Sequence, residues 1–447
     1  MIRQNFNADW TVEKGDGNSR MNSFLGNTQT KTVHLPYDAM IHEARTPDTK
    51  NGAQTGFYPG GEYIFQKHFT APQAWQGKPV SLVFEGVYQT ALVYLNGWLL
   101  TRNVNGYAEF TVEAGPYLKY GADNLLKVIA DNSLEPNSRW YTGSGIYRPV
   151  RLLVGNKVYL PQDTVRITTR EADEGFALLD VTAQVQSAST VTERVTLQQT
   201  ICREGTAVLT DRQNLLLQPG ESRTVSFRYC VDSPALWSPE NPNLYTSTMQ
   251  VLEGEEELDR EETGFGIRTL SIDAAHGVRI NGQTVKLRGA CIHHDNGILG
   301  AATLPDAEER RIRQLKEAGF NAIRSSHHPA GRALLDACDR YGVLVMDELS
   351  DVWNVRKNPY DYALYFEQDW KPTIQKMVAK DYNHPSVILY CVGNEISEAG
   401  SESGAETNRR LCNTFRELDP TRYTTNALNG LMAAGYRLRE IMGDVMR

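Results

Sequence analysis

The hydrophobic and polar positions divide the chain into a long first part that alternates with period two and a last part that does not. In residues 1–155, short alternating segments such as 80–85 and 91–95 are separated by turn signals, including Asn96-Gly97. This spacing predicts a β-sandwich or jelly roll. Residues 156–269 alternate again, and their length of about 110 residues suits an immunoglobulin-like sandwich.

The pattern changes near residue 270, where strand-like segments begin to alternate with segments of helical periodicity. Strands are predicted at 285–289, 321–324, 343–348, 387–392 and 423–427, and helices at 306–318, 332–341, 366–380 and 407–417. Repeated βα units indicate a parallel sheet. Five strands fit before Arg447, whereas a closed (β/α)8 barrel has eight. Residues 270–447 are therefore either the first part of a barrel or a different parallel sheet.

Length and composition set the class of protein but not its chemistry. A chain of 447 residues suggests roughly three domains. The net charge of −8 and the lack of a Lys/Arg run argue against nucleic acid as a partner, and no apolar stretch is long enough to predict a membrane span. The six cysteines form no CxxC, so neither a metal finger nor a redox motif is expected. An N-terminus without an apolar signal core favours a cytoplasmic location.

The apolar run 387–392 ends abruptly in Gly393-Asn394-Glu395. A continuous apolar run of this length fits a strand that is buried on both faces. A carboxylate directly after such a strand sits at its carboxyl end, which in a (β/α)8 barrel is the face that carries the chemistry. We therefore predict that Glu395 acts as a proton donor and that Asn394 contacts the ligand beside it. The structural alternative is that Glu395 caps the following helix or pairs with an Arg.

Polar residues at the ends of neighbouring predicted strands can share one pocket with Glu395. They lie at 291–295, at 324–329 and at Asp347-Glu348. His, Asn, Arg and Trp side chains together with carboxylates offer both donors and acceptors, which suits a polyhydroxylated ligand. We interpret Arg324 as the counter-charge of a carboxylate such as Glu348.

Two parts of these clusters have competing interpretations. The adjacent His293 and His294 could hold zinc, but the sequence has no HExxH and no third ligand at a useful spacing. No metal is therefore expected, and either His could simply be a satisfied polar residue. Trp353, just after the third predicted strand, is either a stacking platform for a sugar or part of the core.

The motifs of the whole chain, taken in order, resemble those of glycoside hydrolase family 2, the β-galactosidase and β-glucuronidase group. They are SRWY…GIYR at 138–148, GFGIR at 264–268, NG…LRG at 281–289, NAIRSSH at 321–327, CDRYG…DE at 338–348 and NHPSV…GNE at 383–395. The resemblance implies a multidomain β plus α/β protein. Its parts would be a jelly-roll sugar-binding domain at 1–155, an immunoglobulin-like β-sandwich at 156–269 and the first part of a (β/α)8 TIM barrel at 270–447.

The resemblance also implies roles for individual residues in a retaining mechanism that uses two glutamates. Glu395 matches the general acid/base, and Asn394 matches the residue that contacts the sugar 2-hydroxyl. Arg139 resembles an arginine that reaches the sugar from the jelly roll, although an interdomain salt bridge explains it equally well. The other candidate substrate-binding residues are His293, Asp295, Arg324, His327 and Trp353. The sequence His293-His294-Asp295 looks like the β-galactosidase branch of the family rather than the β-glucuronidase branch.

Two departures from the family limit these expectations. Val352 and Asn354 stand where some β-galactosidases bind magnesium, so no metal or other cofactor is expected. The family's nucleophilic Glu follows a later strand that would lie beyond Arg447, so this chain alone is expected to be inactive.

The sequence thus predicts a retaining glycosidase that cleaves terminal β-galactosides. A β-glucuronidase is the alternative within the family, and a non-catalytic carbohydrate-binding protein is the alternative outside it. A carbohydrate substrate is the expected partner, and a homo-oligomer is compatible with the sequence.

Overall fold

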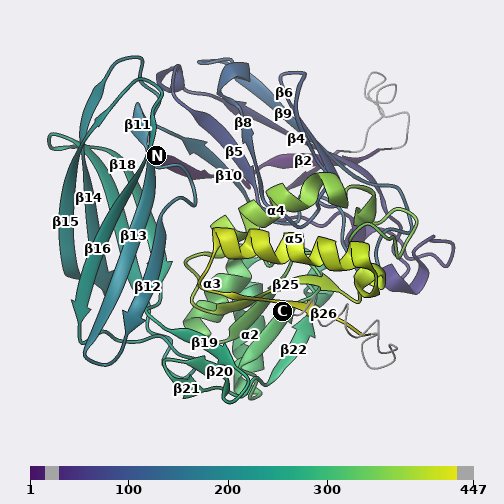
Figure 1. The fold of residues 1–447 in the computed structure, drawn as a ribbon. Helices are drawn as coiled ribbons and strands as arrows, with labels where there is room; N and C mark the ends of the chain where they lie inside the picture. The colour runs from purple at the N-terminus through teal and green to yellow at the C-terminus, as the bar shows by residue number, and fades with distance from the viewer. Residues whose placement is uncertain (16–29, 430–447) are drawn as a thin grey trace.

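The computed structural model describes residues 1–15 and 30–429. They form two β-sandwiches and one unit of parallel strands and helices (Figure 1). The N-terminal sandwich lies at the top of Figure 1, the second sandwich at the left and the parallel unit below them. The predicted multidomain β plus α/β fold is confirmed.

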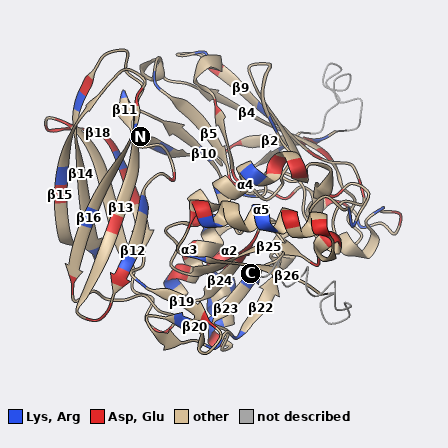
Figure 2. Ribbon diagram, viewed as in Figure 1, with Lys and Arg blue, Asp and Glu red and all other residues tan. Residues whose placement is uncertain are grey.

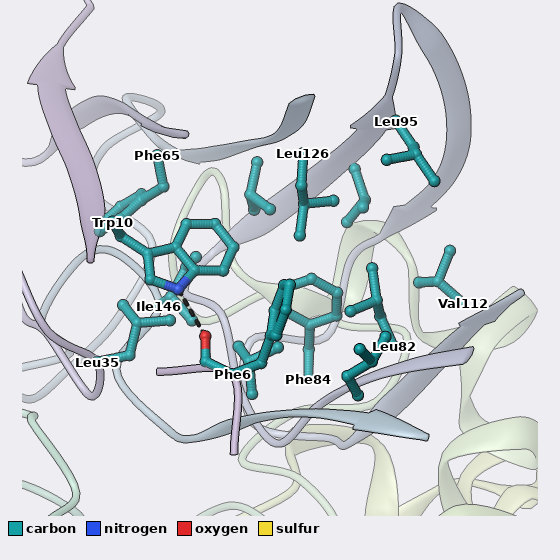
Figure 3. Close-up of a cluster of buried hydrophobic side chains, with 14 of the residues drawn as sticks. Phe6, Trp10, Leu35, Phe65, Leu82, Phe84, Leu95, Val112, Leu126 and Ile146 are labelled. Atoms are coloured by element: carbon teal, nitrogen blue, oxygen red, sulfur yellow. Dashed lines mark hydrogen bonds between the residues drawn. The ribbon is translucent and has the colours of Figure 1, made fainter. Parts of the chain in front are cut away.

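The jelly-roll part consists of two antiparallel sheets packed on an apolar core. The four-stranded sheet has the order β1 (Ile2–Asn5), β10 (Val150–Val154), β5 (Val80–Phe84) and β8 (Phe110–Glu113). The six-stranded sheet has the order β3 (Lys31–Val33), β2 (Trp10–Lys14), β4 (Gly61–Thr70), β9 (Asp123–Asn132), β6 (Thr90–Leu95) and β7 (Trp98–Asn103). Every second residue of β9 is buried from Asn124 on, as the sequence alternation requires. Trp10 lies in the core, where its indole Nε1 donates to the carbonyl oxygen of Phe6 at 2.8 Å (Figure 3).

The immunoglobulin-like part is also a pair of antiparallel sheets around its own core. In one sheet β13 (Phe176–Ser187) pairs with β11 (Val158–Tyr159), β12 (Arg166–Ala172) and β16 (Ser222–Asp232). The other has the order β15 (Thr206–Leu217), β14 (Glu193–Arg203), β17 (Tyr245–Glu253) and β18 (Glu256–Phe265).

The parallel unit follows a small antiparallel sheet of β19 (Leu270–Asp273), β20 (Gly277–Ile280) and β21 (Gln283–Thr284). Its five parallel strands stand side by side in chain order, which is the order of a TIM barrel. They are β22 (Gly289–Ile292), β23 (Ala322–Ser325), β24 (Leu344–Glu348), β25 (Val387–Asn394) and β26 (Tyr423–Ala427). The connecting helices are α2 (Pro305–Glu317), α3 (Arg332–Tyr341), α4 (Phe366–Asp381) and α5 (Glu402–Leu418).

Short 3-10 helices occur in the loops between these elements. They are η1 (Met40–His42), η2 (Gly52–Thr55), η3 (Gln73–Trp75), η4 (Gly115–Tyr117), η5 (Gly297–Leu299), η6 (Tyr362–Leu364) and η7 (Ser397–Gly400).

The first parallel strand begins later than the sequence indicated. It was predicted at 285–289, but β22 begins at Gly289. The N–H of Val285 instead donates to the carbonyl oxygen of Val278 at 2.9 Å, and the N–H of Arg288 donates to the Asn321 side chain at 2.7 Å. These local partners take the backbone donors that a longer strand would have used. Residues 430–447 of the predicted third domain lie outside the described part of the chain.

Acidic and basic positions alternate along the ribbon of both sandwiches and of the outer helices of the parallel unit (Figure 2). No helix within residues 1–15 and 30–429 is long and apolar enough to cross a membrane.

Candidate active site

Glu395 lies immediately after β25, at the carboxyl end of the parallel strands. Its backbone has a φ of 46°, a region that non-glycine residues rarely adopt, and its N–H donates to the carbonyl oxygen of Ala427 at 2.7 Å. The side chain is 43% exposed, and its Oε2 lies 3.4 Å from Nη1 of Arg139. The carboxylate is therefore accessible to a ligand and has a cation at its side.

Asn394 is held by hydrogen bonds on both sides of its amide. Its Oδ1 accepts from Nη2 of Arg324 at 2.8 Å, and its Nδ2 donates to Oδ1 of Asp351 at 2.8 Å. The side chain is buried. The amide next to Glu395 is thus fixed in one orientation, which is what a residue that reads a ligand hydroxyl needs.

Next to this amide, an ion pair of Arg324 and the fully buried Glu348 joins β23 to β24. Nη2 of Arg324 donates to Oε1 of Glu348 at 2.6 Å, and Nδ1 of His327 lies 2.9 Å from Oε2 of the same carboxylate. Burial opposes the charge on Arg324, but the hydrogen bond to Glu348 and the charge of that carboxylate outweigh burial and raise the pKa of the guanidinium. The pairing of Arg324 with Glu348 that the sequence suggested is present.

His293, at the end of β22, packs on an aromatic ring that the sequence analysis did not single out. The imidazole stacks on Trp140 with 5.1 Å between ring centroids and 18° between planes, and it meets His327 edge to face at 5.6 Å. The Nε1 of Trp140 donates to the hydroxyl of Tyr107 at 3.0 Å. Burial lowers the pKa of His293, so the ring favours its neutral form, in which one nitrogen donates and the other accepts.

The neighbouring His294 has a different place. It is buried, its Nε2 lies 2.9 Å from the carbonyl oxygen of Thr142, and burial lowers its pKa to about 3. Of the adjacent pair, His294 joins the barrel to the jelly roll and His293 faces the ring of Trp140.

Arg139 reaches Glu395 from the jelly roll and also forms an interdomain salt bridge. Its Nη2 and Nε donate to the two carboxylate oxygens of Asp351 at 2.6 and 3.1 Å. Asp351 also accepts from Nζ of Lys357 at 3.0 Å. Neither Asp351 nor Lys357 was predicted from the sequence as part of the site. A cavity of about 50 Å³ between the jelly roll and the barrel is lined by Trp140, His327 and Asp351, among others.

Trp353 does not lie in the site, which corrects its prediction as a substrate-binding residue. Its side chain is 0% exposed, and its Nε1 donates to the carbonyl oxygen of Val392 at 2.9 Å within the core of the parallel unit. Both ring faces are covered by protein, so the ring cannot stack on a ligand. Of the two interpretations of Trp353, packing is the one that fits the structure.

Asp295, another predicted site residue, lies two residues after His293 in the same loop. Its charge favours the protonated form of His293, although burial of that ring has the larger effect on its pKa. The side chain is half-buried.

One group of side chains in the described residues has the ligand types and spacing to hold a metal ion, namely Asp336, Asp339 and His384. It lies at the other end of the barrel, because His384 precedes β25 whereas Glu395 follows it. Nδ1 of His384 lies 2.5 Å from Oδ2 of Asp339, and the N–H of Ser386 donates to the other oxygen at 3.0 Å. These contacts already satisfy Asp339 as part of an ion pair.

Arg311 of α2 holds the loop that carries His293 and Asp295. Its guanidinium donates to the carbonyl oxygens of these two residues at 2.8 and 2.5 Å and to Oδ1 of Asn296 at 3.2 Å. Nη1 lies 3.7 Å from Oε2 of the buried Glu308. One side chain thus fixes three points of a loop that borders the site.

Replacing Arg311 with Ala is expected to loosen residues 293–300 while leaving the rest of the fold in place. Hydrogen bonds to a charged donor contribute about 1.5–3 kcal/mol each, so amides of this loop should exchange roughly 10- to 100-fold faster. Hydrogen–deuterium exchange read by mass spectrometry measures this directly. Arg313→Ala, an exposed neighbour on the same helix, is the matched control. Unchanged exchange in Arg311→Ala would show that other contacts suffice to hold the loop.

Three sequence models of glycosyl hydrolases family 2 match consecutive parts of this chain. The galactose-binding domain-like model matches residues 10–176, a second model of the family matches 158–268, and its TIM barrel domain matches 274–441.

Proteins similar to this chain include enzymes with two different named activities. The β-galactosidase BoGH2A of Bacteroides ovatus is 37% identical over 91% of this chain and 48% of its own length. A β-glucuronidase of Bacteroides fragilis is 27% identical over 90% of this chain and 58% of its own length. The crystal structure of a glycosyl hydrolase family 2 member from Bacteroides cellulosilyticus has a TM-score of 0.94 at 35% identity, and the match covers 99% of this chain and 58% of that chain. The chain spans about half the length of the curated relatives that it matches.

Proposed function

Because the chain belongs to glycoside hydrolase family 2, we propose that the complete protein is a retaining glycosidase that cleaves terminal β-galactosides. The observation that carries this proposal is the position of Glu395. Its accessible carboxylate follows β25 directly, next to the fixed amide of Asn394. In this proposal Glu395 is the general acid/base and Asn394 contacts the sugar.

The reaction proceeds in two steps at the anomeric carbon. In the first step the protonated Glu395 gives its proton to the glycosidic oxygen as the bond from that oxygen to the anomeric carbon breaks, and a nucleophilic carboxylate forms a new bond to the carbon. In the second step the Glu395 carboxylate takes a proton from water while the water oxygen displaces the nucleophile. We assign the nucleophile to a later strand of the barrel than the five described here, as the sequence resemblance implies.

The remaining residues of the site suit the binding of a neutral sugar. His293 in its neutral form and the amide of Asn394 each offer a donor and an acceptor, and hydroxyl groups need both. Arg324 and Glu348 neutralise one another, so this pair adds no net charge to the site. Trp140 supplies an aromatic ring at the edge of the site.

Cleavage of a panel of aryl β-glycosides by the complete protein tests the proposal. We expect kcat/KM for the β-galactoside to exceed that for the β-glucuronide, the β-glucoside and the β-mannoside, with the β-anomer of galactose as the first product. Product anomer is measured by NMR before mutarotation.

Preferential cleavage of the glucuronide would change the proposed activity from β-galactosidase to β-glucuronidase. The second activity is the one named for several relatives. Calorimetric binding of galactose without turnover of any glycoside would instead favour a non-catalytic carbohydrate-binding protein.

A further inference from the structure

We propose that Asp351 is a positioning residue of this site, which holds Asn394 in place and limits the contact of Arg139 with the carboxylate of Glu395 to one long hydrogen bond. This inference rests on the proposed function of Glu395 as general acid/base. It assigns to Asp351 a role that acts through its neighbours rather than through contact with the reacting atoms.

Asp351 receives hydrogen bonds from three side chains that surround Glu395. Both of its oxygens bind Arg139, at 2.6 and 3.1 Å, and Oδ1 also binds Lys357 at 3.0 Å and Asn394 at 2.8 Å. Lys357 donates in addition to the backbone carbonyl oxygen of Asn394 at 2.6 Å. The side chain of Asp351 is 11% exposed, so these contacts are largely shielded from water.

The sheet register explains why Asp351 can do this. Strands β24 and β25 are parallel neighbours in which Glu348 lies opposite Cys391. Three residues further along each strand direction stand Asp351 and Asn394, so a side chain just past the end of β24 meets the last side chain of β25. The pairing of β24 with β25 therefore positions the carboxylate of Asp351 as well as that of Glu395.

Arg139 is shared unequally between two carboxylates. Two of its nitrogens bind Asp351, whereas the separation from Glu395 is 3.4 Å. Burial opposes ionisation of Asp351, but its hydrogen bond from Arg139, the charge of Lys357 and the hydrogen bond from Asn394 outweigh burial and lower its pKa. Asp351 therefore stays ionised at neutral pH and holds the charge of Arg139.

Two cations that bind Asp351 also interact with Glu395: Arg139 contacts its carboxylate at 3.4 Å, and the charge of Glu395 favours the protonated form of Lys357. If the anion at 351 were lost, two cations would remain beside Glu395 without their main partner. Arg139, which already donates to Glu395 at 3.4 Å, would then have Glu395 as its main carboxylate partner and would favour the ionised form of that carboxylate. An ionised Glu395 has no proton to give, so bond cleavage that needs an acid should slow most.

The test is Asp351→Asn in the complete protein, assayed with two substrates of the same sugar. For an alkyl or phenyl glycoside, whose leaving group needs a proton, kcat/KM should fall about 10- to 100-fold. For a dinitrophenyl glycoside, whose leaving group needs none, it should fall less than about threefold. A residue that only supported the fold would lower both values alike and would lower the unfolding temperature as well.

A double variant separates the freed charge of Arg139 from other effects. In the variant that combines Arg139→Gln with Asp351→Asn, kcat/KM should depend on the leaving group no more than in Arg139→Gln alone, because the cation in direct contact with Glu395 is gone. Asp336→Asn, an exposed carboxylate on α3, is the control and should keep wild-type kinetics.

The outcomes distinguish the two proposals. An inactive wild-type protein, or a fully active Glu395→Gln variant, would overturn the proposed function. The role of Asp351 alone would be overturned by a different result. In that result the wild type is active and Glu395→Gln is impaired, but kcat/KM of Asp351→Asn depends on the leaving group as it does in the wild type. If the losses of kcat/KM from Arg139→Gln and Asp351→Asn simply add in the double variant, Asp351 acts on the substrate directly. That result would also overturn the positioning role of Asp351.

Discussion

Glu395→Gln in the complete protein is expected to lower kcat/KM for a β-galactoside with a poor leaving group by about 10²- to 10⁴-fold, which is the usual contribution of a general acid. Gln has nearly the same shape as Glu, but its amide cannot deliver a proton at neutral pH. The departing alkoxide must then leave unprotonated. If the substrate panel selects a different sugar, the same measurement applies to glycosides of that sugar.

The same variant should behave differently with an activated substrate. A dinitrophenolate needs no proton, so the first step should stay close to its wild-type rate. The second step still lacks its base, so the glycosyl-enzyme should accumulate, with a burst of phenolate followed by slow turnover and a lowered KM. Azide, which needs no base to attack, should restore turnover and yield a glycosyl azide.

Glu398→Gln is the matched control for Glu395→Gln. This carboxylate lies three residues further on, in η7, and accepts from the N–H groups of Asn354 and Val355 at 2.8 and 3.2 Å. It stands outside the proposed machinery, so the variant should keep the wild-type dependence on the leaving group. Wild-type hydrolysis of the unactivated glycoside by Glu395→Gln would contradict the assignment of Glu395.

Local sequence patterns predicted the strands whose side chains are buried at regular intervals along the strand itself. The alternation in the two sandwiches and the apolar run before Asn394 both correspond to strands, because the period of side-chain burial is a property of a single strand. The first parallel strand was placed too early because Val285 pairs within a small antiparallel sheet that has no distinct pattern of its own.

The candidate site was predictable where residues stand at the carboxyl end of a strand or directly after it. The ends of parallel strands meet on one face, so His293, Arg324 and Asn394 could be grouped from their positions alone. Loop residues could not be treated in this way. Trp353 turned inward to the core, whereas Asp351, two residues before it, bonds to the jelly roll.

Contacts between distant parts of the chain left no local signal. Arg139 and Asp351 are 212 residues apart, and Trp140 and His293 come from different domains. The motif that contains Arg139 and Trp140 was visible in the sequence, but the partners of these residues follow only from the way the jelly roll packs on the barrel. The nucleophile stays a prediction.

Arg332→Met is expected to lower the stability of the complete protein by about 2–4 kcal/mol, because it leaves two carboxylates from different domains without their shared cation. Arg332, the first residue of α3, donates to both oxygens of Glu109 in the jelly roll at 2.8 and 2.9 Å and also to Asp163 in the immunoglobulin-like part. Removing one partner of a fully buried pair costs about 3–5 kcal/mol. The Arg332 side chain is 19% exposed, so water screens part of that cost.

Urea unfolding followed by Trp fluorescence measures the effect. Met keeps the aliphatic part of the side chain, which limits the loss of packing. Arg340→Ala removes a pair in which both side chains are about half exposed, and it should change stability by less than about 0.5 kcal/mol. An unfolding midpoint in Arg332→Met equal to that of the wild type would show that the group of Arg332, Glu109 and Asp163 contributes nothing measurable to stability.

The effect of Arg332→Met should also depend on pH, with a sign that follows from Asp163. Burial opposes ionisation of Asp163, but the charge of Arg332 and the hydrogen bond from it outweigh burial and lower its pKa in the folded protein. A carboxyl whose folded pKa lies below its unfolded value of about 3.9 stabilises the protein above that value and loses this contribution as the pH falls through the folded pKa. The difference between wild type and variant should therefore be full at pH 7 and shrink below about pH 4.

A triple variant tests whether the cost comes from unpaired charge. Arg332→Met combined with Glu109→Gln and Asp163→Asn removes the cation and both of the carboxylates that it serves. Because burying ions is itself costly, replacing a whole group of them can be nearly neutral even where removal of one is severe. The triple variant should therefore be more stable than Arg332→Met alone. A triple variant less stable than Arg332→Met would mean that Glu109 and Asp163 hold the three domains together through their other contacts, such as those of Glu109 with Arg151 and Gln162.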